Sequence, residues 1–574
     1  MVSQGTAVRT RPAGVALPGL VDRPRSVPST IAWLVRFSAV LAFLTEAAPG
    51  HGVEGGPFDI ISDGVGFATA MASAAAMLLL AGGLRRRNRR AWRFALGVVA
   101  AGVLAHLQTQ RFAVAAVYLV VLVVLVHGRD EFTARSQRRS RLAAIRVFLV
   151  MGGGSMVAGL LLASRTAPHS AFGDRVVEVF FGLLGFAPQL RFRDSGLSEL
   201  TGIALGTLGA FTALFTLAAM LAPVRKPPVR TADDEQRLRD LLARFGQHDS
   251  LGYFCLRSDK SVIFSASGKA AVAYRVLGGV SLASGDPIGD YEAWPGAIEA
   301  WLAEAELYGW VPGVVGTSEA GALVLKRYGL DALELGDEAV VDLAGFTLEG
   351  RAMRGVRQAV NRCVRAGYTC RVDRQKDLAP AVLSELGAAA EAFRGEEVER
   401  GFSMALSRLG DVAADPDLAL AQVRDADGRL VAVLGFVPWG ATGLSLDLMR
   451  RARGSENGTV EFAVAQVAEA TRGWGVKRIS LNFAVFRAVF ARGARVGAGP
   501  VLRLWHRVLL LVSRWFQVES LYRANAKYHP DWVPRFVSFR RSLDLPRIAL
   551  AALEAEAFVA RPHLPRWLHP QRGR

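Results

Sequence analysis

Three segments in the C-terminal half of the chain combine side chains that can bind anions, move protons and stabilise negative charge. They are residues 445–450 (SLDLMR) with 456–462 (ENGTVEF), residues 480–484 (SLNFA), and residues 519–536 (ESLYRANAKYHPDWVPRF). Asp447 can bind an amino group or accept a hydroxyl proton, and Asn482 can donate a hydrogen bond to an oxyanion. A plainer interpretation also fits each residue: an ion pair between Asp447 and Arg450, and a satisfied buried amide at Asn482.

The third segment carries two cations, Lys527 and Arg535, in a frame of prolines around Trp532. Arginine binds phosphate through paired donors, and lysine acts as a point charge. The frame favours an ordered loop that holds a phosphate, with surface charge as the alternative. Trp532 can stack on an aromatic ring or pack in the core, and packing is favoured. Glu461 either orients Arg450 or is an ordinary helix residue.

Two kinds of site have no support in the sequence. Cys255, Cys363 and Cys370 lack the spacing of a metal site and the histidines are scattered, so we expect no metal and no bound cofactor. A CoA-dependent acetyltransferase needs a glycine-rich loop that opens a helix and binds pyrophosphate. Residues 453–458 (RGSENG) stand at that place with a different pattern, which argues against an acyl-CoA donor.

A basic helix is predicted over residues 347–364. Its arginines fall on one broad face and include Arg351, Arg354, Arg357 and Arg362. Several arginines on one face can each neutralise a phosphate, so this face is a candidate surface for RNA. A solvated charged helix face is the alternative.

The composition of the whole chain indicates a membrane protein that meets polyanions. The 574 residues are 51% hydrophobic, with a mean hydropathy of +0.25 and a net charge of +18. The hydropathy is high for a soluble enzyme, and the apolar content with three cysteines excludes a disordered chain and a disulfide scaffold. Positive charge on an apolar chain points to anionic lipid, nucleic acid, or both.

Six apolar runs of membrane-spanning type lie in the first part of the chain, at residues 31–48, 64–84, 94–110, 112–127, 147–164 and 200–224. The run 176–190 carries Glu178 and Pro188 and is predicted to be interfacial or re-entrant rather than a seventh span. Basic clusters fall on every second loop, which by the positive-inside rule places both termini in the cytoplasm. We therefore expect a multi-pass protein of the cell membrane.

Beyond Pro227 and Pro228 the pattern changes to mixed α/β. The order strand, strand, helix, strand occurs twice, which is the order of an N-acetyltransferase-like core. The predicted organisation is a cytoplasmic N-terminal tail (1–30), a helical transmembrane domain of about six spans (31–225), a first N-acetyltransferase-like unit with the basic helix (231–375), a second unit (376–545) and a C-terminal tail (546–574).

At the three polar segments the chain resembles the cytoplasmic transferase domain of the phosphatidylglycerol lysyltransferase family, also called multiple peptide resistance factors. The shared features are the Asp-Leu-Met-Arg, Asn-Gly and Glu-Phe elements, the Leu-Asn-Phe strand and the Lys-Tyr-x-Pro-x-Trp-x-x-Arg-Phe ending. The resemblance covers roughly residues 245–545. It is nearest to the actinobacterial form with a fused lysyl-tRNA synthetase, which has no counterpart in these 574 residues.

This resemblance implies a tandem N-acetyltransferase-like fold and the transfer of an aminoacyl group from aminoacyl-tRNA to a hydroxyl of phosphatidylglycerol, without ATP or metal. The candidate residues are then Asp447, Asn482 and Lys527 for catalysis, Arg450, Glu461, Trp532 and Arg535 for substrate binding, and Arg351, Arg354, Arg357 and Arg362 for tRNA binding. The amino acid is open, with lysyl expected. Such a product lowers the negative charge of the membrane and weakens the binding of cationic peptides.

Three alternatives stay open at this stage. The same chemistry can act on another lipid acceptor. The cytoplasmic domain can bind without catalysing, as part of a lipid flippase or transport scaffold. An acyl-CoA-dependent N-acyltransferase is the third, and the pattern at residues 453–458 disfavours it.

Overall fold

The structure, a computed structural model, describes residues 30–37, 64–85, 88–108, 112–129, 132, 138–184, 195–221, 230–396, 398–406, 408–485 and 523–559. The chain divides into two compact units, residues 1–221 and 222–574, and each is described by itself.

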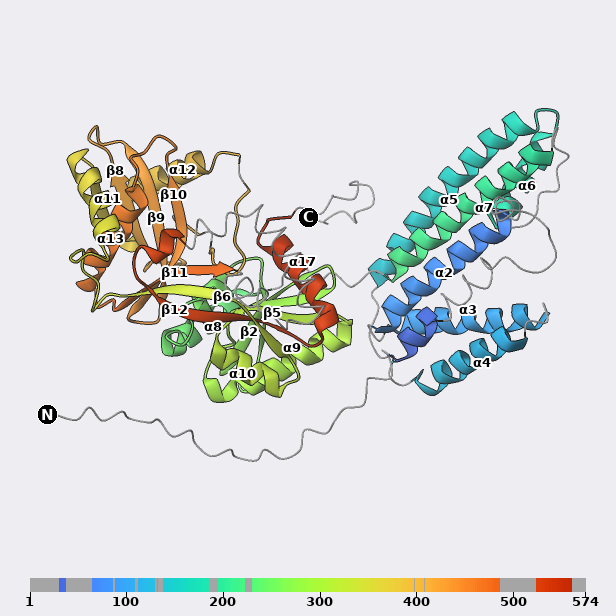
Figure 1. The fold of residues 1–574 in the computed structure, drawn as a ribbon, viewed down its shortest axis with the longest axis horizontal. Helices are drawn as coiled ribbons and strands as arrows, with labels where there is room; N and C mark the ends of the chain where they lie inside the picture. The colour runs from blue at the N-terminus through green and yellow to red at the C-terminus, as the bar shows by residue number, and fades with distance from the viewer. Residues whose placement is uncertain are drawn as a thin grey trace. The chain divides into compact units, whose positions relative to one another are not determined.

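The described part of the N-terminal unit consists mainly of helices (Figure 1). They are α2 (Gly64–Arg85), α3 (Arg89–Gln108), α4 (Phe112–His127), α5 (Arg138–Thr166), α6 (Phe172–Leu183) and α7 (Ser195–Met220). Within the described residues, two segments are long and apolar enough to cross a membrane: Leu142–Thr166 in α5 and Thr201–Met220 in α7. Shorter apolar segments occur in α2 and α4. The unit therefore has membrane character, and the count of six spans stays a prediction.

Small residues let α5, α6 and α7 approach each other closely. A Cβ added at Gly159 of α5 would lie 2.5 Å from a methyl group of Val179 and 2.8 Å from one of Leu205. The hydroxyls of Ser155 and Thr212 lie 3.0 Å apart and join α5 to α7. Close contacts through glycine and hydroxyl groups are typical of helix pairs in lipid. The first predicted span is described only over residues 30–37, which are helical, and the predicted tail at 1–29 lies outside the described residues.

A mixed sheet of twelve strands forms the centre of the C-terminal unit. Its strands are β1 (Ser261–Phe264), β2 (Ala270–Leu277), β3 (Val280–Ser284), β4 (Ile288–Gly289), β5 (Val311–Thr317), β6 (Asp331–Asp342), β7 (Thr369–Arg374), β8 (Ala419–Arg424), β9 (Leu430–Trp439), β10 (Gly443–Arg451), β11 (Arg478–Val485) and β12 (Asp531–Phe539). Around it lie α8 (Ala232–Phe245), α9 (Trp294–Tyr308), α10 (Glu319–Arg327), α11 (Arg354–Arg365), α12 (Pro380–Arg394), α13 (Thr459–Arg472) and α17 (Leu545–Ala555).

The sheet is made of two halves that exchange a strand. The order along it is β1-β2-β3-β5-β12-β6-β11-β10-β9-β8-β7, with β4 paired to β2. β3 pairs with β5 in parallel, and β10 with β11, whereas the other pairs are antiparallel. β6 follows the first half in sequence but pairs with β11, and β12 follows the second half but pairs with β5. The sheet therefore runs without a break through both predicted units. The boundary predicted between them at residue 375 stays a prediction.

The two faces of the second half carry different helices. Leu434 and Phe436 of β9 pack in one core with α11 and α13. Val433 and Val437 of the same strand point the other way: Val433 packs with α12, and Val437 packs with α8 and with Leu406. Because side chains alternate along a strand, α11 and α13 cover one face and α12 and α8 the other.

Arg535 of β12 stands at the centre of a buried network that joins both halves. Its guanidinium donates to Glu338 of β6 from Nε at 2.8 Å and Nη2 at 2.5 Å, to Asp249 at 2.7 Å, and to Gly316 and Ser250. Glu338 also accepts the hydroxyls of Ser250 and Ser480. Burial lowers the pKa of Arg535, but the two facing carboxylates outweigh burial and the pKa is raised.

This network contradicts the prediction that Arg535 binds substrate phosphate. The side chain is 3% exposed, and its five N–H donors all have partners inside the protein. The segment expected to be an ordered loop around it is instead the strand β12.

Two further expectations are corrected. The basic helix was predicted from residue 347, but α11 begins at Arg354. The predicted C-terminal tail contains α17, in which Ile548 and Ala551 are buried against β3 and β5. Arg357 holds the residues before α11 in a turn through the carbonyls of Leu348 and Gly350, and α17 packs on strands distant in sequence, so neither boundary follows from local pattern.

We predict that Arg535→Met lowers the free energy of unfolding by about 3–5 kcal/mol, because it leaves two buried carboxylates without their cation. Denaturant unfolding of the full chain in detergent, followed by tryptophan fluorescence, measures the change. Arg371→Met is the matched control, since the Arg371–Asp373 pair is at the surface with Arg371 72% exposed, and it should cost less than about 1 kcal/mol. Equal losses in the two variants would contradict the central role of Arg535.

Candidate functional site

The candidate site lies where the parallel strands β10 and β11 separate. They pair only over Gly443–Ser445 and Arg478–Ser480. Just beyond, β10 has a bulge at Asp447, and the pairing of β11 with β6 is irregular at Asn482. Bulges redirect side chains and are frequent next to active sites. The structure thus places Asp447 and Asn482 at the same opening of the sheet, as their predicted roles require.

Asp447 is a half-buried carboxylate with one described hydrogen bond. Its Oδ1 accepts the backbone N–H of Leu406 at 2.5 Å. Burial raises the pKa of Asp447 to about 7, and the Leu406 hydrogen bond opposes this rise. A carboxylate with this pKa can take up and release a proton near neutral pH, as a general base must. Its described partner is the amide of Leu406 rather than Arg450, which was the alternative from sequence.

Asn482 bridges the opening between the two strands. Its backbone has a φ of +68°, in the left-handed region, and its Nδ2 donates to the carbonyl of Leu446 at 2.9 Å. Its Oδ1 is buried and has no hydrogen-bond partner within the described structure. The hydrogen bond to Leu446 therefore sets the orientation of the Asn482 amide. The remaining side-chain atom, Oδ1, is a hydrogen-bond acceptor. An oxyanion-donating role for Asn482 stays a prediction.

Lys527 pairs with Glu461 in the first turn of α13, with Nζ and Oε1 2.6 Å apart. The Lys527 side chain is 48% exposed and that of Glu461 18%. Asn525 fixes this turn next to β11 by donating to the carbonyl of Leu481 at 3.2 Å, and Tyr528 is buried in the α13 core. Of the two roles predicted for Glu461, orienting Arg450 or being an ordinary helix residue, the first has no described contact, because the described partner of Glu461 is Lys527.

The predicted residues therefore fall into two groups on opposite faces of the sheet. Glu461 and Lys527 lie with α13, and Trp532 packs against the same core. Asp447 contacts Leu406, which packs with α8 on the other face. The opening at Asp447 and Asn482 is the place where the two faces meet.

The arginines of the basic segment are not all equally accessible to a ligand. Arg351, Arg354 and Arg362 are exposed, while the opposite side of α11 is buried. Arg357 is half-buried and donates to the carbonyls of Leu348 and Gly350 at 2.5 and 2.9 Å, so it holds the preceding loop. Its predicted contact with tRNA stays a prediction, with Nη1 already engaged by these two carbonyls.

α11 packs directly on the loop that opens α13. Gly458 at the start of α13 has a φ of +100°, and a Cβ there would lie 2.6 Å from the Cβ of Ala359 in α11. Arg362 donates to the carbonyl of Asn457 at 3.2 Å. The exposed arginines of α11 are consequently held beside the helix that carries Glu461.

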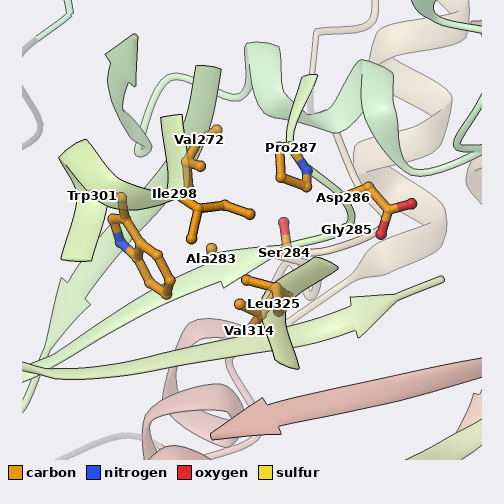
Figure 2. Close-up of a pocket in the computed structure, with 11 residues that line it drawn as sticks. Val272, Ala283, Ser284, Gly285, Asp286, Pro287, Ile298, Trp301, Val314 and Leu325 are labelled. Carbon is orange, nitrogen blue, oxygen red and sulfur yellow. The ribbon is translucent and has the colours of Figure 1, made fainter. Parts of the chain in front are cut away.

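The matching opening in the first half is filled by the protein itself. Asp286, directly after β3, accepts hydrogen bonds from Thr317 Oγ1 at 2.6 Å and from the N–H and hydroxyl of Ser318 at 2.8 and 2.5 Å. Burial, with the nearby Asp249, raises its pKa to about 6. Figure 2 shows Trp301 and Ile298 on the other side of the adjoining cavity, which has a volume of about 10 Å³. That volume has room for about one water molecule.

Lys260 is a buried lysine that the sequence analysis did not single out. Its Nζ donates to Ser284 at 2.6 Å and lies 4.5 Å from the centre of the Phe402 ring. Burial lowers the pKa of Lys260 to about 8. The only signal in the sequence was that lysine is rare in this chain. Across the described parts of the chain, no group of three or more histidine, cysteine, aspartate or glutamate residues is placed to hold a metal ion.

Comparison with known proteins assigns this arrangement to a family. Residues 239–539 match the family profile "Phosphatidylglycerol lysyltransferase, C-terminal". The chain belongs to this family. Residues 23–222 match the profile "Transmembrane region of lysyl-tRNA synthetase". The predicted family and the membrane region are thus confirmed, while the number of spans and the side of the termini stay predictions.

Individual relatives agree with the family match. The chain is 42% identical over 562 residues to the lysylphosphatidylglycerol biosynthesis bifunctional protein LysX of Mycobacterium avium, covering 94% of this chain and 47% of the relative. It is 41% identical over 583 residues to LysX of Mycobacterium tuberculosis, covering 98% and 50%. The chain thus spans about half the length of these relatives. The solved structure of L-PGS from Bacillus licheniformis is 22% identical with a TM-score of 0.49, covering 58% of this chain and 98% of that one.

We predict that Asp447→Asn stabilises the folded chain at pH 8. The carboxyl of Asp447 has a pKa of about 7 when folded, above the ordinary value, so the folded state holds its proton longer than the unfolded state does. Stability from this group therefore falls as the pH rises from about 4 to 7 and stays low above 7. A neutral amide removes this cost, on the order of 1–3 kcal/mol at pH 8.

Denaturant unfolding at pH 5 and pH 8 tests this, and the gain from Asp447→Asn should shrink at pH 5. Asp417→Asn is the control and should lower the stability at pH 8 rather than raise it. The reason is that the hydrogen bond from Lys376 holds the pKa of Asp417 below its ordinary value. The same gain from Asp447→Asn at both pH values would show that burial of its charge is not the cause.

Proposed function

We propose that this chain transfers an aminoacyl group from aminoacyl-tRNA to a hydroxyl of phosphatidylglycerol. The observation that carries the proposal is Asp447, a carboxylate of near-neutral pKa at the opening between β10 and β11. The family match supports the same reaction class.

In the proposed reaction, a glycerol hydroxyl of the lipid attacks the carbonyl carbon of the aminoacyl ester and Asp447 takes up the hydroxyl proton. The tetrahedral intermediate then collapses, and the bond between that carbon and the ribose oxygen of tRNA breaks. Asp447 returns the proton to the ribose oxygen. One ester is broken and one is formed, so the step needs no ATP and depends on positioning and proton transfer.

The two substrates are proposed to reach the opening from opposite faces of the sheet. Lys527 shares its face with the exposed arginines of α11. Its ammonium uses one donor on Glu461, which leaves further donors for a phosphate near the 3′ end of tRNA. The lipid then approaches from the face of Leu406, where the Asp447 carboxylate lies. Arg450 remains a candidate for binding either substrate.

Lysine is the proposed amino acid, since the relatives are named for lysylphosphatidylglycerol biosynthesis. A lysyl group adds positive charge to an anionic lipid, which would lower the surface negativity of the membrane and weaken the binding of cationic peptides. The proposed topology is that of six spans with both termini in the cytoplasm, which places the C-terminal unit on the side where charged tRNA is available.

A reconstituted transfer assay tests the proposal. The full chain is placed in phosphatidylglycerol nanodiscs with radiolabelled lysyl-tRNA or alanyl-tRNA, and labelled lipid is counted. We expect lysyl transfer, and we expect Asp447→Asn to lower kcat at least about 100-fold, as loss of a general base does. Asp425→Asn, in the turn between β8 and β9, is the control and should keep the wild-type rate.

Other outcomes of this assay separate the alternatives. Labelled product in nanodiscs of a neutral lipid, but not of phosphatidylglycerol, would keep the chemistry and change the acceptor. No labelled lipid with either tRNA, from a folded chain, would contradict the proposal and favour a binding or transport role.

The basic surface gives a second prediction. Changing Arg351, Arg354 and Arg362 to glutamine should weaken tRNA binding and reduce the slope of log K against log salt by about 0.7–0.9 for each arginine that contacts a phosphate. Filter binding at several salt concentrations measures both. Arg429→Gln is the matched control, because Arg429 is 77% exposed and lies outside α11. An unchanged slope in the triple variant would place the tRNA elsewhere.

A further inference from the structure

Residues 398–406, here called the strap, carry the backbone N–H that bonds Asp447. Phe402, Ser403 and Leu406 of the strap are almost completely buried. The strap follows α12 in sequence and ends at Leu406, whose N–H donates to the Asp447 carboxylate at 2.5 Å. The position of the proposed general base therefore depends on how this segment is held.

The strap is held from outside the second half of the sheet. The carboxylate of Glu556, directly after α17, accepts the N–H groups of Phe402 at 2.6 Å and Ser403 at 3.0 Å. From the first half, Arg257 donates to the carbonyl of Ala405 at 2.7 Å. Lys260, also from the first half, places its ammonium against the Phe402 ring.

The backbone conformation of the strap is tightly constrained at Gly401. Gly401 has a φ of +123°, which is unfavourable for any residue with a side chain. A Cβ added there would lie 2.3 Å from the Cβ of Ala405. The strap thus folds back tightly on itself just before the residues that Glu556 and Arg257 hold.

We propose that Glu556 and Arg257 are positioning residues that act on Asp447 through the strap. The C-terminal helix and the first half of the sheet then determine how the base of the second half is presented to the lipid hydroxyl. This inference rests on the proposed function, since it takes Asp447 to be the group that accepts the proton.

The electrostatics around Asp447 give the inference a measurable consequence. The groups that act on its carboxyl are the N–H of Leu406 and the charges of Glu399, Arg257 and Asp415. The Leu406 N–H stabilises the ionised carboxylate and so lowers its pKa, against the effect of burial. A loosened strap weakens this hydrogen bond, and the pKa of Asp447 then rises further. Because the base must be ionised to act, activity should need a higher pH.

The experiment is the pH profile of transfer by the full chain in phosphatidylglycerol nanodiscs, between pH 6 and 8.5. Glu556→Gln removes the charge that holds the two strap N–H groups. Gly401→Ala disturbs the strap without touching either Glu556 or Asp447. In both variants the midpoint of the acidic limb should move up by about one pH unit, the shift expected when a hydrogen bond to a charged group is largely lost.

Glu306→Gln is the matched control, since Glu306 pairs with Arg540 at the surface and does not contact the strap. It should leave the midpoint unchanged. An unmoved midpoint in Gly401→Ala and Glu556→Gln, or a lower rate at every pH with the wild-type midpoint, would overturn the positioning role. If Glu556→Gln fails to fold, the Gly401→Ala profile decides.

Failure of this inference and failure of the proposed function give different results. If Asp447→Asn keeps wild-type transfer, the proposed base is wrong and the strap has no catalytic target. If Asp447→Asn is inactive while both strap variants keep the wild-type midpoint, the proposed function stands and only the positioning role is lost.

Discussion

The buried contact between Arg535 and the carboxylates of Glu338 and Asp249 is the constraint on which the C-terminal unit depends. Arg535 lies on β12 and Glu338 on β6, the two strands that the halves of the sheet exchange. A buried cation is tolerated only when its charge and donors are fully matched, and here the five donors are matched. The network fixes the register of the exchanged strands and so joins the halves into one sheet.

Once the halves are joined, they can differ in what their parallel strand pairs do. In the first half, Asp286 turns its carboxylate inward to Thr317 and Ser318, and the adjoining cavity has room for about one water molecule. In the second half, the bulge at Asp447 and the left-handed backbone of Asn482 keep β10 and β11 apart beyond their short pairing. Strained backbone and an unpaired buried acceptor are costs that proteins commonly retain at functional sites. The first half therefore acts as support, and the second half carries the proposed chemistry.

Much of this fold could be predicted from local sequence pattern. The order of strands and helices in each half follows from apolar alternation and turn residues, as in the hairpin of β8 and β9 around Asp427 and Gly428. The exchange of β6 and β12 could not be predicted, because strand pairing depends on partners far apart in sequence. For the same reason Arg535, in a motif rich in proline and aromatic residues, was taken for a phosphate ligand, although its partners are nearly 200 and 300 residues away.

The site itself was predictable in part. The family resemblance implied acyl transfer with Asp447, Asn482 and Lys527 as candidates, and the structure pairs Lys527 with Glu461. Their separation onto two faces of the sheet was not predictable, because the bulge at Asp447 breaks the simple alternation of side chains. The strap was missed because its link to Asp447 runs through a backbone N–H, which has no signature in residue type.

The most direct test of the central claim is lipid mass spectrometry of a bacterial host that makes no aminoacylated phosphatidylglycerol, with and without the full chain. We predict a new lipid whose mass equals that of phosphatidylglycerol plus a lysyl group, present with the wild-type chain and missing with Asp447→Asn. A different added mass would change the amino acid and keep the reaction. An unchanged lipid profile, with the chain verified in the membrane, would contradict the account.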